Sequence, residues 1–168
     1  MLKDIITSRV RLNLLIKFFL NISNRDYLNS LANEFGDSTN SIRKELNNLS
    51  NAGYLKKYNE NNKVIYKANK NHPLFNTLRS IIKKHLGIED IINSVIENIG
   101  EIDKIVLLGD YAKGIDSGTI EVLILGRSIN IDYLNNLRPK IEKKIKRKVN
   151  FFVSSEVSYN RGLIVFES

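Results

Sequence analysis

The sequence of 168 residues has no cysteine and no tryptophan, and only two prolines and two histidines. Without cysteine, disulfides and zinc–thiolate sites are excluded, and His72 and His85 are too few for a metal cluster. Long hydrophobic runs are also lacking. The longest, Leu14–Ile16 and Phe18–Leu20, fall far short of the roughly 20 residues that span a bilayer. Since the N-terminus shows no signal-peptide pattern either, we expect a cytoplasmic protein with no membrane contact, metal or cofactor.

Positive charge is concentrated in the first half of the chain. The net charge is +8. Residues 1–87 hold 15 lysines and arginines against six acids, whereas residues 88–168 hold 11 against 12. A basic module beside a nearly neutral one predicts a polyanion that only the first module contacts. The alternative is a basic protein whose lysines are merely solvated.

Hydrophobic periodicity in the first half predicts three helices and a hairpin. We expect Gly36 to end the second helix in the left-handed conformation, and Asp26 to cap its start. The polar turn Asn59–Lys63 is expected to join the two strands. The predicted helices are 5–20, 26–35 and 38–52, and the predicted strands are 54–58 and 64–68.

The third predicted helix has the side chains of a DNA-reading helix. Asn40, Arg43, Lys44 and Asn47 form a polar stripe at helical spacing, opposite Ile42, Leu46 and Leu49. Arginine pairs with guanine, asparagine with adenine, and lysine with phosphate. An ordinary solvated helix face is the alternative. The full predicted DNA-binding set is Ser38, Thr39, Asn40, Ser41, Arg43, Lys44, Asn47, Lys56, Lys57, Asn61, Asn62 and Lys63, and Lys67 also lies in the hairpin.

Several short sequence segments within residues 2–70 resemble those of ArsR-like winged-helix regulators. They are the helix Arg9–Leu20, Leu31-Ala32, and Ile42-Arg43-Lys44-Glu45-Leu46 through Leu49 to Ala52-Gly53-Tyr54-Leu55. The resemblance implies a winged helix-turn-helix whose third helix enters the major groove of double-stranded DNA. Related winged helices dimerise through their first and last helices. We therefore expect a homodimer formed by the apolar faces of Ile5–Phe19 and Leu74–Leu86.

The second half is expected to alternate helices and strands. Helices are predicted at 74–86, 89–99 and 132–148, and strands at 105–108, 120–125, 149–153 and 163–166, with a glycine-rich loop at Gly109–Thr119. The run from Ile105 to Leu125 resembles the core of the minimal nucleotidyltransferases, in Gly109 and in Tyr111-Ala112-Lys113-Gly114. The resemblance implies a small α/β domain with a mixed sheet.

The nucleotidyltransferase pattern lacks its carboxylates. Asp110 stands where the family has a phosphate-contacting serine, and the family's Ser-Asp-x-Asp word aligns with Gly118, Thr119, Ile120 and Glu121. The third acidic position falls near Asn150, and two magnesium ions need more than one acid. We therefore expect a catalytically inactive domain with no catalytic residue and a vestigial nucleotide site at Gly109, Asp110, Lys113, Gly114, Thr119 and Glu121.

The connector Tyr66–Ile88, with His72-Pro73-Leu74-Phe75, resembles the joint of regulators that fuse a winged helix to such a domain. We expect His72 to cap or pack in this joint. The fold predicted is α+β: a winged helix-turn-helix domain at 1–70, connector helices at 71–100, and a nucleotidyltransferase-like domain at 101–168.

The function predicted is a sequence-specific transcriptional regulator. The second domain would serve ligand sensing or protein interaction, with a protein or a nucleotide as the effector. The run Lys140–Lys148 is a candidate second anion surface. The alternative is a nucleotidyltransferase that acts on a protein or small molecule.

Overall fold

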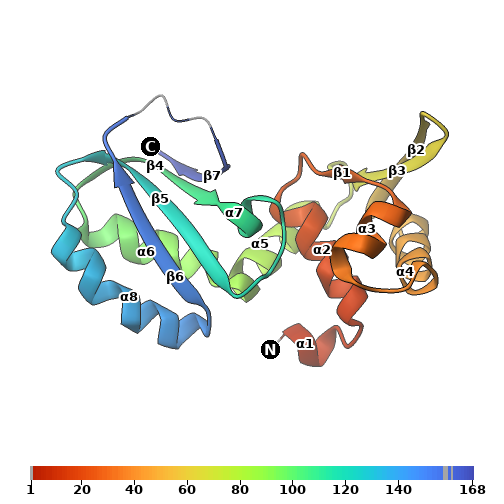
Figure 1. Cartoon of the computed structure of the whole chain (residues 1–168), viewed down its shortest axis with the longest axis horizontal. Helices are drawn as coiled ribbons and strands as arrows, with labels where there is room; N and C mark the ends of the chain where they lie inside the picture. Colours follow the sequence, from red (N-terminus) through yellow and green to blue (C-terminus); the bar gives the residue numbers. More distant parts are fainter. Residues whose placement is uncertain (1, 157–158, 160) are drawn as a thin grey trace. The chain divides into compact units, whose positions relative to one another are not determined.

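The computed structural model describes residues 2–156, 159 and 161–168, which form an α+β protein of two compact units, Met1–Ile82 and Lys83–Ser168 (Figure 1). The division falls inside one helix. The α+β class is confirmed, whereas the predicted domain limits stay a prediction. No helix in the described part of the chain is long and apolar enough to cross a bilayer.

The first unit follows the predicted order of three helices and a hairpin. Its elements are α1 (Leu2–Ile5), α2 (Arg9–Leu20), β1 (Arg25–Asp26), α3 (Leu28–Phe35), α4 (Thr39–Asn51), β2 (Leu55–Glu60), β3 (Lys63–Ala68) and most of α5 (Phe75–Leu86). The three short strands form one antiparallel sheet in the order β1-β3-β2.

Two predictions about the first unit are wrong at helix starts. The helix predicted from residue 5 begins at Arg9, because the Ser8 side chain caps it by accepting a hydrogen bond from the Arg11 amide. Asp26 does not cap α3. It belongs to β1, where it pairs with Tyr66, and Tyr27 takes the N-cap position.

The turn between α3 and α4 is built as the sequence predicts. Gly36 ends α3 in the left-handed region at φ 66°, and its amide donates to the Ala32 carbonyl. Ser38 then caps α4 by accepting from the Ser41 amide at 3.2 Å. A left-handed residue followed at once by an N-cap gives the tight connection that a helix-turn-helix needs.

Helix α2 forms the centre of the first unit's core. Leu14, Phe18 and Phe19 are fully buried, and Phe19 lies against Phe75 with ring centroids 5.7 Å apart. The expectation that α2 keeps an apolar face for a partner is therefore wrong. Of the apolar residues named for dimerisation, Ile5, Leu74 and Ile81 remain exposed.

The second unit is a four-stranded mixed sheet with helices. Its elements are the end of α5, α6 (Ile88–Asn98), β4 (Glu101–Leu108), α7 (Gly109–Ala112), β5 (Thr119–Arg127), α8 (Ile131–Ile145), β6 (Lys148–Ser154) and β7 (Leu163–Glu167). The strand order is β6-β5-β4-β7, with β5 and β6 parallel and the other pairs antiparallel. Figure 1 shows α6 and α8 on one side of this sheet. The mixed sheet is as predicted.

The three largest differences from the prediction in the second unit lie in its first strand, its glycine-rich loop and its last helix. The first strand begins at Glu101 rather than Ile105, and the predicted loop 109–119 opens with the helical turn α7. Helix α8 ends at Ile145 rather than at Lys148, because Lys146 adopts the left-handed conformation and the chain enters β6.

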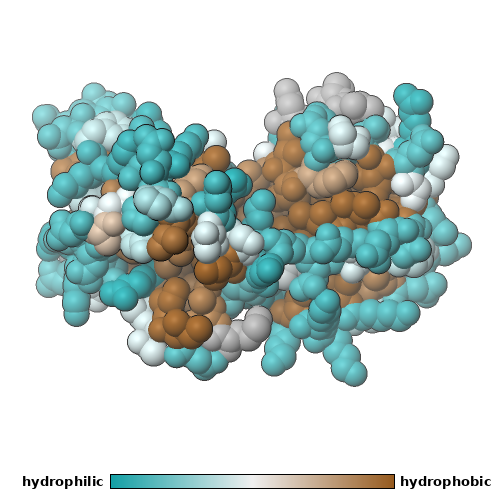
Figure 2. All heavy atoms as spheres, turned by 180° about the vertical axis from the view of Figure 1, so that it is seen from behind, coloured by the Kyte–Doolittle hydropathy of each residue, from teal (hydrophilic) through white to brown (hydrophobic). Residues whose placement is uncertain are grey.

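Hydrophobic residues reach the surface in patches between hydrophilic ones (Figure 2). In the second unit, Phe152 and Ile164 are both 44% exposed. Both lie on the sheet face that also carries the buried cluster Val106, Leu123 and Leu125, because Phe152 pairs with Leu123 and Ile164 with Val106. Side chains alternate between the two faces of a sheet, which fixes this assignment.

Candidate nucleic-acid interface

Helix α4 separates its side chains into a buried stripe and an exposed polar face. Ile42 and Leu46 are fully buried, and Leu49 is buried with them. All predicted contacts on and before this helix are exposed: Ser38, Thr39, Asn40, Ser41, Arg43, Lys44 and Asn47. The Arg43 guanidinium donates to the Asn40 side-chain oxygen at 3.0 Å, one turn earlier. Their contact with DNA stays a prediction.

The acid of α4 does not lie on this polar face. The Glu45 side chain is buried, with one carboxylate oxygen 2.7 Å from Arg11 Nε and the other accepting from the Ser8 hydroxyl at 3.1 Å. Burial alone would raise the pKa of Glu45, but the hydrogen bonds from Arg11 and Ser8 outweigh it and hold that pKa below its ordinary value. The face that carries Arg43 and Lys44 is therefore cationic and free of an opposing carboxylate on the same helix.

A hollow of about 430 Å³ lies between α4 and the hairpin. Four predicted contacts line it, Arg43 and Asn47 from α4 with Asn62 and Lys63 from the hairpin. Residues that the sequence analysis did not single out complete the lining: Tyr27, Leu28, Asn29, Leu46, Val64 and Tyr66. Lys63 Nζ lies 4.1 Å from the centroid of the Tyr27 ring, a contact between the hairpin and the start of α3.

The hairpin ends in a tight turn at Asn61 and Asn62. Both have positive φ, at 49° and 60°, which matches the two-residue turn whose twist suits a hairpin. Glu60 pairs with Lys63 across that turn. The predicted tip residues Asn61, Asn62 and Lys63 are all exposed.

The predicted hairpin lysines do not form one surface. Neighbouring residues of a strand point to opposite faces, so Lys56 and Lys57 lie on different sides of the sheet. Lys57 pairs with Tyr66, which lines the hollow, whereas Lys56 pairs with Lys67 on the other face. Lys56 therefore does not share the sheet face that lines the hollow beside α4, and its contact with DNA stays a prediction.

In the second unit, the structure brings together some of the residues predicted to form a vestigial nucleotide site. Glu121 is the register partner of Leu108 on one neighbouring strand and of Asn150 on the other. Glu121 and Asn150, which align with acidic positions of the nucleotidyltransferase pattern, therefore lie on one face of the sheet. The Glu121 carboxylate also lies so close to Gly109 that a Cβ at that glycine would meet it at 2.1 Å. Asp110 and Lys113 lie on and just after α7, and Gly114 follows with a positive φ of 78°. Thr119 is exposed at the start of β5.

A separate hollow of about 430 Å³ opens beside this site. Gly109 and Lys113 line it together with Leu108, Ala112, Tyr159, Arg161 and Gly162. Asp110, Gly114, Thr119 and Glu121 are not among its lining residues. The structure thus places the predicted site residues around α7 without gathering them in one cavity.

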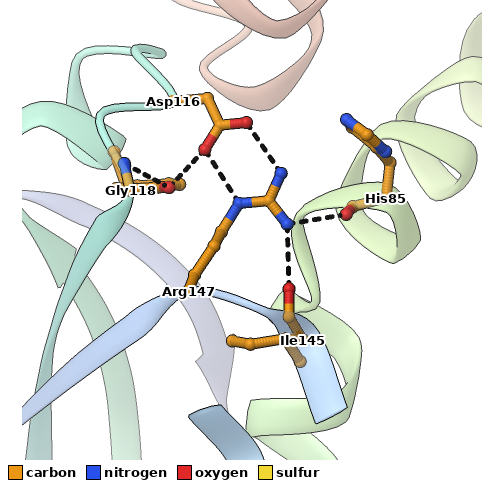
Figure 3. A network of polar contacts seen from close by, with 6 residues as sticks. His85, Asp116, Gly118, Ile145 and Arg147 are labelled. Atoms are coloured by element: carbon orange, nitrogen blue, oxygen red, sulfur yellow. Dashed lines mark hydrogen bonds and ion pairs between the residues drawn. The ribbon is translucent and has the colours of Figure 1, made fainter. Parts of the chain in front are cut away.

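Asp116 forms the centre of a polar network in the same unit (Figure 3). Arg147 Nε and Nη2 donate to its two carboxylate oxygens at 2.8 and 2.7 Å, and the Tyr111 hydroxyl donates to it as well. Arg147 Nη1 also donates to the carbonyls of His85 and Ile145, at 3.1 and 3.3 Å. The network ties the loop after α7 to the ends of α5 and α8.

The pKa values of the network follow from its contacts. Burial by itself would raise the pKa of Asp116, but the bonds from Arg147 and Tyr111 hold it below the ordinary value. Burial and the bond to Asp116 both raise the pKa of Tyr111 well above its ordinary value. Tyr111 also accepts from the Gly118 amide at 3.1 Å.

The basic run Lys140–Lys148 does not form one surface. Arg147 is bound to Asp116, Lys144 lies 2.6 Å from Asp90, and Lys148 lies 3.8 Å from Glu142. The run is divided between α8, its C-cap and β6. Three of its six cations are thus paired with carboxylates, which weakens the run as an anion-binding surface.

His72 has the capping and packing role that its position in the connector predicts. Its Nδ1 accepts from the Leu74 amide at 3.0 Å, and its ring lies against Tyr54 with centroids 4.2 Å apart.

No protein-family model and no curated protein matches the chain. Two solved structures are similar to part of it. One is Sso10a-2, a DNA-binding protein from Sulfolobus solfataricus, with 20% identity and a TM-score of 0.36 over 51% of this chain and 87% of that one. The other is the AntR antimony-specific transcriptional repressor, with 15% identity and a TM-score of 0.37 over 51% of this chain and 68% of that one. At TM-scores below 0.5, neither assigns this chain a fold or a ligand.

Proposed function

We propose that the chain is a sequence-specific transcriptional regulator that binds double-stranded DNA through a winged helix-turn-helix in its first unit. The hollow lined by Arg43, Asn47, Asn62 and Lys63 carries this proposal. It joins the exposed face of one helix to a hairpin tip, and both sides contribute a cation and an amide. A helix and an adjacent wing with these side chains suit a major groove and its flanking backbone.

Each part of the site has a distinct task. Arg43 and Asn47 read base edges from the middle of α4, because guanidinium and amide groups form paired hydrogen bonds with guanine and adenine. Lys44 and the hydroxyls at the start of α4 position the phosphate backbone. Asn62 and Lys63 hold the backbone beside the groove. Because the Glu45 side chain is buried, the exposed face of α4 has no carboxylate that would repel the DNA phosphates.

The test compares wild type with Arg43→Ala/Lys44→Ala in gel shifts on mixed-sequence duplex DNA. We expect at least roughly tenfold weaker binding, since on mixed-sequence DNA both cations act on phosphates, and each phosphate contact contributes about 0.9 to the slope of log affinity against log salt. Lys140→Gln/Lys143→Gln removes two charges from exposed positions of α8 and serves as the control. Equal binding by wild type and the α4 variant at moderate salt contradicts the proposal.

For the second unit we propose a nucleotidyltransferase-like domain that is catalytically inactive and serves ligand sensing or protein interaction. Glu121 supports this, because its register partners Leu108 and Asn150 supply no second carboxylate. Its carboxylate also lies against Gly109, where the family holds phosphate. Incubation with labelled nucleoside triphosphates and magnesium tests the proposal: label transfer that is lost in Glu121→Gln contradicts it. A nucleotide-dependent rise in melting temperature identifies a nucleotide as the effector.

We further propose that the regulator is a homodimer on a two-fold site. Leu74, directly before α5, and Ile81 on α5 support it, because they are 46% and 40% exposed. Sedimentation of wild type and Ile81→Glu provides the test. Monomeric wild type at micromolar concentration contradicts it.

A further inference from the structure

The sheet of the first unit carries three cations in one row. Lys67 of the central strand β3 pairs with Lys56 of β2 on one side and with Arg25 of β1 on the other. Residues directly opposite each other share a face, and neighbouring strands are about 4.8 Å apart. All three residues are exposed. Three positive charges thus stand in line on one face of a small sheet.

This row opposes folding, since like charges directly opposite each other destabilise a sheet. Arg25 has a partner in Glu60, at 2.9 Å. In the part of the chain that the structure describes, no carboxylate lies within ion-pair distance of Lys56 or Lys67. Protection of an open sheet edge, a common reason for strand lysines, does not explain Lys67, because β3 is the middle strand.

The Tyr58 ring contacts two of the three cations in the row. Lys67 Nζ and the Arg25 guanidinium lie 5.2 and 5.8 Å from the centroid of the Tyr58 ring. These contacts restrict two long side chains at the surface of the sheet without cancelling their charge. The row is therefore a partly ordered cationic site.

The row is separate from the hollow beside α4, because none of its three residues lines that hollow. Lys63, which does line it, shares the face of Lys67 but lies at the opposite end of β3, next to the hairpin turn. Val64 and Tyr66 line the hollow beside α4, and strand alternation places both on the face opposite Lys67. We propose that Lys56, Lys67 and Arg25 bind the phosphate backbone of the same duplex, in the segment that flanks the part held by α4. This inference depends on the proposed DNA-binding function.

Two arguments favour the duplex that α4 binds as the ligand of the row: its charge, and the fact that α4 already holds it close to the row. Lysine and arginine contacts to phosphate supply the sequence-independent part of DNA binding. Three such contacts alone are weak, but a duplex already seated against α4 presents its flanking phosphates at high effective concentration. A continuous duplex is thus a better occupant than a second, separate one.

The experiment measures how binding to fluorescein-labelled mixed-sequence duplexes depends on salt. Duplexes of about 12 and about 30 base pairs are used, because about 10 base pairs make one helical turn and the shorter one leaves little flanking backbone. The test variant is Lys56→Gln/Lys67→Gln. The charge-preserving variant is Lys56→Arg/Lys67→Arg, and Lys140→Gln/Lys143→Gln is the control with an equal charge loss.

On the long duplex, the slope of log affinity against log salt should fall by about two in the Gln variant, since each phosphate contact contributes about 0.9. The ratio of wild-type affinity to variant affinity should therefore fall about fourfold when the salt concentration doubles. On the short duplex the two proteins should bind alike. The Arg variant and the α8 control should behave as wild type. Thermal melting checks folding and should show the Gln variant at least as stable as wild type.

Three results overturn the inference. An unchanged slope on the long duplex shows that the row is only solvated. An equal loss on both duplexes places the row inside the α4 footprint. In the third result, protein bound to an immobilised duplex captures a second, free duplex. If this capture needs the row and binding does not depend on duplex length, the row binds a second duplex. If Arg43→Ala/Lys44→Ala weakens binding while the row variant does not, this inference alone fails. If neither variant has an effect, the proposed function fails.

Discussion

Arg11 and Glu45 form an ion pair that joins α2 to α4, with Nε and the carboxylate oxygen 2.7 Å apart. The Glu45 side chain is only 8% exposed, whereas that of Arg11 is 42% exposed. The pair turns the carboxylate of α4 toward the interior of the unit. It thereby stabilises the packing of α4 and leaves the opposite face of that helix cationic.

Replacement of Glu45 by Gln should lower the free energy of unfolding by about 1–2 kcal/mol, because it removes charge-assisted hydrogen bonds from Arg11 and Ser8. The folded-state pKa of Glu45 is below its ordinary value of 4.5. The stabilisation is thus complete above that pH and is lost as the pH falls through the folded-state pKa. Denaturant unfolding from pH 3 to 7 measures this. Exposed Glu97→Gln is the control, and parallel pH curves for wild type and Glu45→Gln would contradict the prediction.

Asp116→Asn should destabilise the second unit, because it leaves the largely buried Arg147 side chain, which is 12% exposed, without its carboxylate. We expect a loss of about 3 kcal/mol, the range found when one partner of a buried ion pair is removed. The pKa of Asp116 is held below its ordinary value of 3.8, so wild type loses this stabilisation only in acid. Thermal melts at pH 7 and pH 3 are the measurement. The exposed acid Asp110, changed to Asn, is the control. A melting temperature for Asp116→Asn equal to that of wild type at pH 7 would refute the role of the ion pair.

Tyr111→Phe should cost about 1–3 kcal/mol, because it removes the hydroxyl that donates to Asp116 and accepts from the Gly118 amide. The pKa of Tyr111 is raised above its ordinary value of 10.0. The stabilisation is therefore present below pH 10 and lost as the pH rises toward the folded-state pKa. Alkaline unfolding should separate wild type from the Phe variant. If Tyr111 ionises at an ordinary pH in an ultraviolet titration, the buried bond is not formed.

Gly36→Ala tests the turn between α3 and α4. No atom lies within 4 Å of a Cβ at this position, so the cost is the left-handed backbone alone. That cost is about 1–2 kcal/mol. Gly36→Asn should cost less, because asparagine tolerates this conformation better. Equal stabilities of the Ala and Asn variants in urea unfolding would contradict this explanation.

Local patterns predict most of the elements. The α4 helix follows from its apolar spacing and the Ser38 cap, and the hairpin follows from two strand-like runs around an asparagine turn. No local pattern predicts strand β1, because its two residues are a strand only through pairing with Lys67 and Tyr66. Helix α7 was missed because four residues within a glycine-rich stretch carry no periodicity.

For the candidate DNA site, too, some features follow from the sequence and others only from the folded structure. Residue types and helical spacing along the chain are enough to select Arg43, Lys44 and Asn47, and to assign the excess of positive charge to the first half. The inward turn of Glu45, the row of Lys56, Lys67 and Arg25, and the approach of Glu121 to Gly109 required the folded chain. Periodicity records only neighbours on one helix or strand, whereas ion pairs and strand register depend on residues that are far apart in sequence and meet only through packing.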